Sequence, residues 1–229
     1  LKQRVSAAKW LTRADSDAEI SELLFAEAPE TAKALRSYQR AGVKFMSINQ
    51  ATLLADSPGA GKSVQTIATM ISAGVSGDIL VLAPSAAIQV TWPAEISRWA
   101  PDDEIVCATG TRKQREAELA KLKKKSRSKR RWVLCNIEMA KVKYHKPTVN
   151  MKKGWYEYIY PELFFINPNK ESKAQKGKKK EWSAIAVDES HRALITNKTQ
   201  AYKQTQTRAG LGKLKTCLLY TSDAAHEKK

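Results

Sequence analysis

The chain has 229 residues, 42% of them apolar, so it can bury one sizeable core and fits one domain with elaborations. Its formal net charge of +17 indicates attraction to a polyanion, either nucleic acid or an anionic membrane surface. No apolar run approaches the roughly 20 residues of a membrane helix, so we expect no membrane partner. The three cysteines show neither disulfide nor zinc-site spacing, so we expect a cytoplasmic protein; they are Cys107, Cys135 and Cys217.

The first 34 residues predict a leading helical segment. Residues 5–34 combine helix-forming residues with apolar positions three and four apart, and Asp15 or Ser16 is a plausible cap, so we expect two short helices. A third helix is expected over residues 35–49, "LRSYQRAGVKFMSIN". These helices precede the first apolar run that is typical of a strand.

Short apolar runs then alternate with helical patterns. Residues 51–56, "ATLLAD", predict a strand that ends in a Gly-rich turn, and residues 62–74 predict the helix after it. Residues 79–85, "ILVLAPS", predict a buried strand, and residues 87–101 predict the next helix. Three more strands are expected at residues 104–110, 132–137 and 182–190. This alternation predicts an α/β fold with a mostly parallel sheet that is covered on both faces.

Two basic segments interrupt the pattern. Residues 112–131 are almost wholly charged, and residues 170–180 form a lysine-rich stretch of low complexity. We interpret both as solvated insertions or helix extensions, with contact to nucleic acid as the alternative. Between them, residues 154–168, "GWYEYIYPELFFINP", concentrate aromatic side chains. We expect this aromatic stretch to pack on the domain or on a neighbouring molecule.

The turn "DSPGAGKS", residues 56–63, has the character of a phosphate-binding loop. Gly59 and Gly61 let the backbone turn so that its N–H groups point into one concavity. Lys62 would place a cation against the β- and γ-phosphates, and the Ser63 hydroxyl would ligate Mg²⁺. The pattern GxxxxGK[ST] matches except at its first position, which holds Asp56, and a chance Gly-rich turn is the alternative.

A second element is "AIAVDESH", residues 184–191, an apolar strand that ends in two acids. Asp188 can hold Mg²⁺, mainly through water, and Glu189 can orient and deprotonate the water that attacks the γ-phosphate. A solvated loop start is the alternative for a lone Asp-Glu pair. Downstream of the Gly-rich loop, and with His191 two residues further on, the functional interpretation is favoured.

These motifs resemble those of superfamily-two helicases, and within them the Swi/Snf-type DNA translocases. The resemblance covers residues 35–219 and rests on "LRSYQRAGVKFM", "LLADSPGAGKSVQTIA", "ILVLAPSAAIQVTWPAEISRW", "VLCNIEMA" and "IAVDESHRALITNKTQAYKQ". It implies a three-layer RecA-like P-loop NTPase lobe with basic insertions, which uses ATP and Mg²⁺. In this family the loop begins with Asp, so Asp56 is a family feature.

The resemblance also implies roles for individual residues. Gln39 would recognise the adenine edge, because a side-chain amide matches its adjacent donor and acceptor. Catalysis would use Lys62, Asp188, Glu189 and His191, and Mg²⁺ would be held by Ser63 and Asp188. The residues expected to bind the nucleotide are Gln39, Asp56, Ser57, Pro58, Gly59, Ala60, Gly61, Lys62 and Ser63. Two positions of the chain depart from the family pattern. Pro58 removes one N–H donor from the Gly-rich loop, and Ser190 replaces a more frequent Ala or Gly after the acidic pair.

Other motifs lie where the family contacts DNA. "APSAAIQVTW" corresponds to a segment that touches the DNA backbone, and Asn136 to a contact with the tracked strand. For Trp92 and Trp99 we favour packing of the helix over a DNA contact. We expect the partner to be double-stranded DNA, bound through its phosphates.

The sequence thus predicts the ATP-binding lobe of an ATP-dependent DNA translocase. The alternatives are a motor lobe of another superfamily-two helicase or restriction subunit, and a non-catalytic basic DNA-binding module. We expect a leading segment (1–34), the lobe (35–219) and a non-native tail (220–229). Because the chain begins at Leu1 and ends in "YTSDAAHEKK", we expect a fragment that is missing both ends. As a separate expectation, the fragment comes from a bacterium or a phage. It would lack the second RecA-like lobe and be inactive alone.

Overall fold

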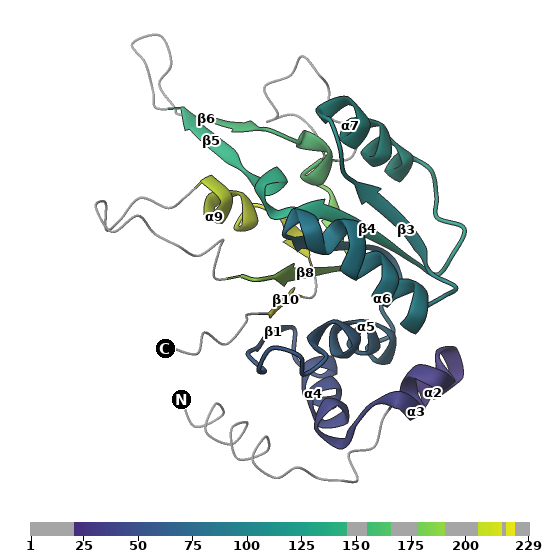
Figure 1. Cartoon of the computed structure of the whole chain (residues 1–229). Coiled ribbons are helices and arrows are strands. Elements are labelled where there is room, and N and C mark those ends of the chain that lie inside the picture. The colour runs from purple at the N-terminus through teal and green to yellow at the C-terminus, as the bar shows by residue number, and fades with distance from the viewer. Residues whose placement is uncertain (1–20, 146–154, 166–177, 191–205, 217–218, 223–229) are drawn as a thin grey trace.

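A six-stranded parallel sheet forms the centre of the protein (Figure 1). The computed structural model describes residues 21–145, 155–165, 178–190, 206–216 and 219–222. The strand order is β1-β10-β8-β2-β4-β3, and every neighbouring pair is parallel. The strands are β1 (Ala51–Leu54), β2 (Gly77–Ala83), β3 (Glu104–Ala108), β4 (Arg130–Asn136), β8 (Ala184–Asp188) and β10 (Leu219–Ser222). This arrangement confirms the predicted α/β fold with a parallel sheet.

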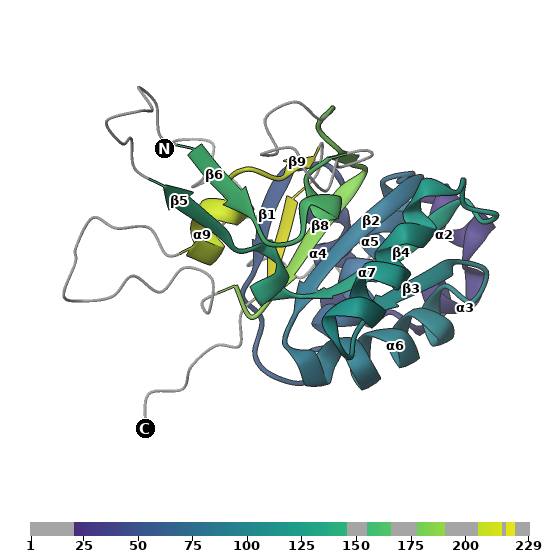
Figure 2. The same cartoon turned by 90° about the horizontal axis from the view of Figure 1, so that it is seen from above.

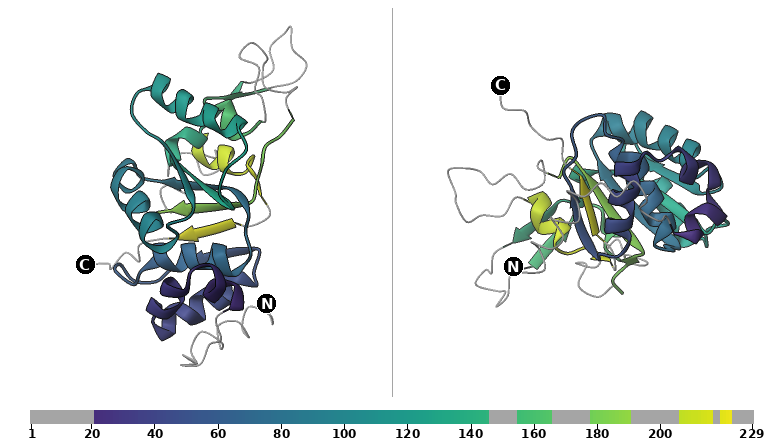
Figure 3. Two further views of the ribbon diagram at one scale, coloured as in Figure 1. Left: turned by 90° about the vertical axis from the view of Figure 1, so that its right-hand side faces the viewer. Right: turned by 90° about the horizontal axis from the view of Figure 1, so that it is seen from below.

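Helices from the first half of the chain cover one face of the sheet (Figure 3). They are α2 (Glu22–Glu27), α3 (Pro29–Ala34), α4 (Ser37–Ser47), α5 (Lys62–Ser72) and α6 (Trp92–Trp99). In β2, Ile79 and Val81 point into this layer while Leu80 and Leu82 point to the other side. From Ile79 to Ala83 the strand is apolar, because a parallel strand buried on both faces needs apolar residues at successive positions.

The opposite face carries α7 (Arg112–Ala120), the antiparallel hairpin of β5 (Val142–His145) and β6 (Trp155–Tyr158), and α9 (Gln206–Leu211) (Figure 2). The predicted packing of the aromatic stretch is confirmed here. The Tyr158 ring lies 4.7 Å from that of Phe164 and 4.9 Å from that of Phe165, and both phenylalanines are buried. A short parallel pair, β7 (Glu181–Trp182) with β9 (Lys215–Thr216), lies beside this layer.

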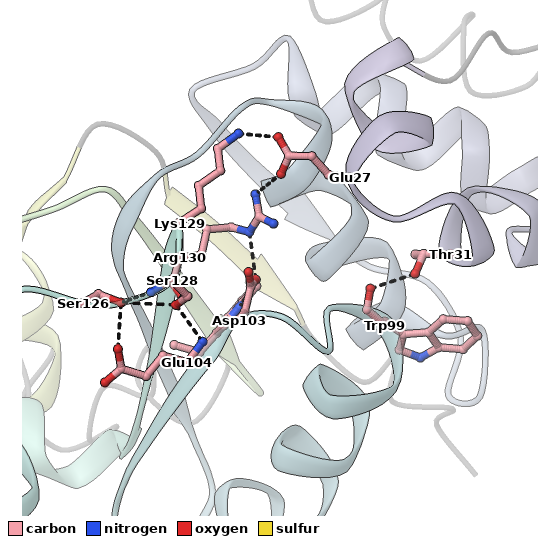
Figure 4. Close-up of polar contacts among 10 residues, drawn as sticks. Glu27, Thr31, Trp99, Asp103, Glu104, Ser126, Ser128, Lys129 and Arg130 are labelled. Atoms are coloured by element: carbon pink, nitrogen blue, oxygen red, sulfur yellow. Dashed lines mark hydrogen bonds and ion pairs between the residues drawn. The ribbon is translucent and has the colours of Figure 1, made fainter.

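At the amino ends of the strands, polar residues pair with one another (Figure 4). Arg130 is 5% exposed and donates to Glu27 at 2.6 Å and to Asp103 at 2.8 Å, while Lys129 also bonds Glu27. The Trp132 indole donates to the same Asp103 carboxylate at 2.8 Å. We call Glu27, Asp103, Lys129, Arg130 and Trp132 the amino-end cluster. It ties helix α2 to strands β3 and β4.

The prediction for residues 112–131 is therefore partly wrong. The helical part is confirmed as α7, but Arg130 and Arg131 begin strand β4 and are 5% and 4% exposed. Arg131 pairs with Asp78 at 2.7 Å. Both guanidinium groups are buried because carboxylates across the strand ends compensate their charge, which a count of basic residues in sequence does not reveal.

Most predicted helices and strands are present. Helices α2, α3, α4 and α5 confirm the predicted ones within the described residues, and the part of the first prediction before residue 21 lies outside them. The helix expected over residues 87–101 instead begins with a π-helical turn, η1 (Ala87–Thr91), before α6. Strand β10 was not predicted, and it lies between β1 and β8. No helix of the described residues is long and apolar enough to cross a membrane.

Candidate nucleotide-binding site

The Gly-rich loop joins the carboxyl end of β1 to the first turn of α5. Gly59 and Gly61 have φ of 81° and 75°, the left-handed region that glycine enters at little cost, and Gly61 is the N-cap of α5. A Cβ on Gly61 would lie 2.5 Å from Gln39 Nε2, so a side chain there would displace the Gln39 amide. The sequence prediction of a strand, a turn and a helix at this point is confirmed.

Lys62 begins α5 and folds back over its own loop. Its Nζ donates to the carbonyl oxygens of Asp56 at 2.9 Å and Ser57 at 3.2 Å. Among the described residues, no carboxylate lies within ion-pair distance of this ammonium group. The positive charge at the helix start is thus held by neutral oxygens.

Helix α4 supports the loop from one side through two side chains. Gln39 is 8% exposed, and its Nε2 donates to the Ala60 carbonyl at 3.0 Å. Its Oε1 accepts the backbone N–H of Arg36 at 2.9 Å, which satisfies a free backbone donor at the start of α4. The Tyr38 hydroxyl donates to the same Ala60 carbonyl at 3.1 Å. Gln39 therefore lies against the loop with both polar atoms of its amide bonded to the protein, and its role in adenine recognition stays a prediction.

Gln65 is a residue of the site that the sequence prediction missed. It is fully buried in α5, and its Nε2 donates to the Asp56 carboxylate at 2.9 Å. Its Oε1 is buried without a hydrogen-bond partner in the structure, and a Cβ on Gly42 would lie 2.3 Å from that oxygen. Asp56 thus anchors the loop to the following helix, which gives a physical reason for an acid at this position.

The acidic pair lies at the carboxyl end of β8. Asp188 is half-buried, and its Oδ1 accepts the backbone N–H of Glu189 at 3.0 Å. Its Oδ2 accepts the indole N–H of Trp92 at 3.1 Å. Glu189 has a φ of 51°, a left-handed conformation that is uncommon for a residue with a side chain and that often accompanies functional sites. His191 lies outside the described residues, and its predicted role stays a prediction.

The loop and the acidic pair emerge from the same edge of the sheet. In the strand register Leu54 of β1 is opposite Ser222 of β10, which is opposite Asp188 of β8. Two strand spacings separate Leu54 from Asp188, about 10 Å between Cα atoms. A parallel sheet brings the carboxyl ends of its strands to one edge, and ligands of open α/β sheets bind there.

The other predicted contact residues have defined surroundings. Trp92 is 2% exposed in the core under the sheet, and Trp99 packs against the same core, with its indole N–H donated to Glu95 at 2.7 Å. The interpretation of both as packing residues is confirmed. Asn136, at the end of β4, bonds the Ser85 hydroxyl at the end of β2 and accepts the backbone N–H of Glu138 at 2.8 Å. Its contact with DNA stays a prediction.

Comparison with known proteins identifies the family. The SNF2-related domain matches residues 38–217, which include the Gly-rich loop and the acidic pair. The chain belongs to this family. The SWI2/SNF2 ATPase core of Sulfolobus solfataricus in complex with dsDNA has a similar fold, with a TM-score of 0.51, 16% identity, and coverage of 91% of this chain and 34% of that one. This similarity confirms the RecA-like fold of the lobe.

Two curated relatives illustrate the similarity of this SNF2-related chain in sequence. Chromodomain-helicase-DNA-binding protein 1-like of Danio rerio is 38% identical over 93 residues, 37% of this chain and 9% of the relative. The CHD3-type chromatin-remodeling factor PICKLE of Arabidopsis thaliana is 30% identical over 181 residues, 73% of this chain and 12% of the relative. The chain therefore spans about a tenth of the length of these relatives.

Proposed function

We propose that this chain is the ATP-binding lobe of an ATP-dependent DNA translocase. The observation that carries the proposal is the shared sheet edge, where a Gly-rich loop at the start of α5 and the Asp188–Glu189 pair at the end of β8 emerge two strand positions apart. A cation-bearing loop beside two acids is the arrangement that phosphoryl transfer from a nucleotide to water needs. Membership of the SNF2-related family supports this assignment.

In this proposal Gln39 of α4 and the residues of the Gly-rich loop bind different parts of ATP. Gln39, held beside Ala60, recognises the adenine edge. Residues 56–61 cradle the phosphates with backbone N–H groups, and Lys62 neutralises the β- and γ-phosphate oxygens. The Lys62 ammonium must exchange its two carbonyl contacts for phosphate oxygens when ATP binds.

The donor set also fits Mg²⁺, since a hydroxyl and a carboxylate are the hard oxygen ligands that this ion prefers. Ser63, half-buried in the first turn of α5, and Asp188 would hold it. Bound there, Mg²⁺ would neutralise charge on the phosphate oxygens. Glu189 orients the attacking water and accepts its proton, and His191 is proposed to assist at the same strand end.

The proposed partner is double-stranded DNA, and the proposed motor needs a second RecA-like lobe. A net charge of +17 favours a polyanionic partner, and the Sulfolobus protein of similar fold was solved with dsDNA. An arginine supplied from outside a nucleotide site accelerates hydrolysis by roughly 10³–10⁵. We therefore expect the chain alone to bind ATP and to hydrolyse it negligibly, with or without duplex DNA.

Isothermal titration of the chain with ATP in excess Mg²⁺ tests the proposal. Lys62→Ala should lower the affinity for ATP at least tenfold, because the phosphates lose their cation, and should leave duplex DNA binding intact. Lys33→Ala is the matched control, since Lys33 pairs with Glu30 on the exposed side of α3. Wild-type chain without measurable ATP affinity, together with intact DNA binding, would instead favour a non-catalytic DNA-binding module.

A further inference from the structure

The buried indole of Trp92 contacts the acidic pair. Trp92 lies at the start of α6, is 2% exposed, and donates its N–H to Asp188 Oδ2 at 3.1 Å across 96 positions of sequence. The indole N–H is the side chain's single polar group, so burial without a partner would cost free energy, and the bond to Asp188 removes that cost.

A π-helical turn precedes Trp92 at the start of α6. In η1 the backbone N–H of Trp92 bonds the carbonyl of Ala87, five residues earlier, instead of that of Ile88. A π-turn inserts one residue relative to an α-helix and so rotates everything before it by about 100° with respect to everything after it. Such turns are frequent at functional sites. Ile88 and Trp92, four residues apart, both enter the core, and the indole reaches the end of β8.

The bond orients the carboxylate through a donor that carries no charge of its own. The Asp188 oxygens accept N–H groups from Trp92 and from the Glu189 backbone, and both donors are uncharged. A carboxylate has about four acceptor sites on its two oxygens, and these two bonds, one on each oxygen, orient the group. Donors of this kind around a metal-binding carboxylate set its orientation and its affinity for the ion.

We propose that Trp92 is a positioning residue that orients Asp188 toward the Mg²⁺ of bound nucleotide. The proposal rests on the function proposed above and adds a residue that acts through Asp188 rather than on the nucleotide itself. It makes α6 part of the ATP site, although α6 follows β2 rather than either strand that carries the nucleotide motifs.

The chain contains a matched bond that serves as a control. The indole of Trp132 is fully buried and donates to Asp103 Oδ2 at 2.8 Å, at the opposite end of the sheet. Trp132→Phe and Trp92→Phe therefore remove the same donor from the same type of acceptor and leave a similar cavity. Any loss that comes only from packing should be common to both variants.

The experiment is titration of each variant with ATP, once in excess Mg²⁺ and once in excess EDTA. Trp92→Phe should lower the affinity for ATP about tenfold in Mg²⁺, the lower end of the effect of residues that orient metal ligands, and should leave the affinity in EDTA unchanged. Trp132→Phe should change neither. With Asp188 already replaced by Ala, Trp92→Phe should have no further effect in Mg²⁺.

Equal losses in Mg²⁺ and EDTA, or equal behaviour of the two tryptophan variants, would overturn the proposal. Wild-type chain that does not bind ATP at all would instead refute the proposed function. If Trp92→Phe does not fold, the assigned indole ¹H–¹⁵N resonances of the wild type decide. The Trp92 resonance should shift when Mg²⁺ is added to the ATP complex while that of Trp132 stays in place, and an unmoved Trp92 resonance would refute the role.

Discussion

The two ends of the central sheet use the same kinds of side chain for different purposes. In the amino-end cluster, Arg130 lies between Glu27 and Asp103, and each charge is compensated by an opposite one. At the carboxyl ends, Lys62 is held by backbone carbonyls, and Asp188 accepts an indole and a backbone N–H. An indole-to-aspartate bond occurs at both ends.

The partners of a charged group decide whether it contributes mainly to stability or to ligand binding. A buried cation that is paired with carboxylates contributes to the fold and has little left to offer a ligand. A cation that is held by neutral groups, such as Lys62, keeps its field, so a ligand of opposite charge gains from it. Substitutions at the amino end should therefore change stability first, and substitutions at the carboxyl end should change nucleotide binding first.

The largest expected effect is that of Arg130→Met. It leaves the buried Asp103 carboxylate without its cation and leaves Glu27 with Lys129 alone, and loss of one partner of a buried ion pair costs about 3–5 kcal/mol. Urea unfolding measures the loss. Arg112→Met is the control, because Arg112 pairs with Glu116 on the exposed side of α7, where such pairs contribute about 0.3–0.5 kcal/mol.

A loss below about 1 kcal/mol for Arg130→Met would break the comparison, since the cluster would then contribute no more than a surface pair. The folded fraction of Arg130→Met should still bind ATP with wild-type affinity. A changed affinity would show that the two ends are coupled through the sheet.

A pair of glycine substitutions tests how closely helix α4 holds the Gly-rich loop at the carboxyl end of the sheet. Gly59→Ala and Gly61→Ala both place a side chain at positive φ, which costs about 1–2 kcal/mol each. At Gly59 a Cβ meets nothing within 4 Å, whereas at Gly61 it meets Gln39 Nε2 at 2.5 Å. Gly61→Ala should therefore cost about 1 kcal/mol more, because it displaces the Gln39 amide from the Ala60 carbonyl.

Urea unfolding measures both glycine variants, and ATP titration shows whether the displaced Gln39 matters for binding. Gly61→Ala should lower the affinity for ATP in EDTA as well as in Mg²⁺, unlike Trp92→Phe. Equal stabilities of Gly59→Ala and Gly61→Ala would mean that Gln39 moves aside at no cost and does not anchor the loop.

The fold could be predicted from the sequence wherever the local pattern of apolar residues matches the packing that those residues have in the structure. Local sequence is enough to predict the apolar strands β2 and β8 and the glycine turn before Lys62, and these predictions are confirmed. Strand β10 has no such signal, since its place is set by pairing with β1 and β8 at long sequence separation. The burial of Arg130 and Arg131 likewise depends on carboxylates from distant segments.

The residues of the site could be predicted where they belong to a sequence motif. They could not be predicted where their role depends on packing in the folded chain. The loop and the acidic pair were identified from spacing, and their placement at one sheet edge agrees with that prediction, while the individual roles stay proposals. Gln65 and the polar contact of Trp92 were missed, because the sequence does not show which group a buried amide or indole will bond in the folded chain. A polar residue at a core-facing helix position, such as Gln65, is the signal that could have found the first.

The smallest expected effect is a pH dependence at the amino end. Burial tends to raise the pKa of Glu27, but hydrogen bonds from Lys129 and Arg130 outweigh it and lower the pKa below its ordinary value of 4.5. A lowered pKa in the folded state contributes stability that is fully present above the unfolded value and is lost as the pH falls through the folded one. Glu27→Gln removes this contribution at every pH.

The free energy of unfolding of the wild type should thus exceed that of Glu27→Gln above about pH 5, and the difference should shrink as the pH falls below 4.5. Urea unfolding of both proteins between pH 7 and pH 3.5 measures it. The difference stays smaller than that for Arg130→Met, because Asp103 still pairs with the guanidinium. A difference that is constant with pH would mean that Glu27 stabilises α2 by packing alone, and the amino-end cluster would then rest on Asp103.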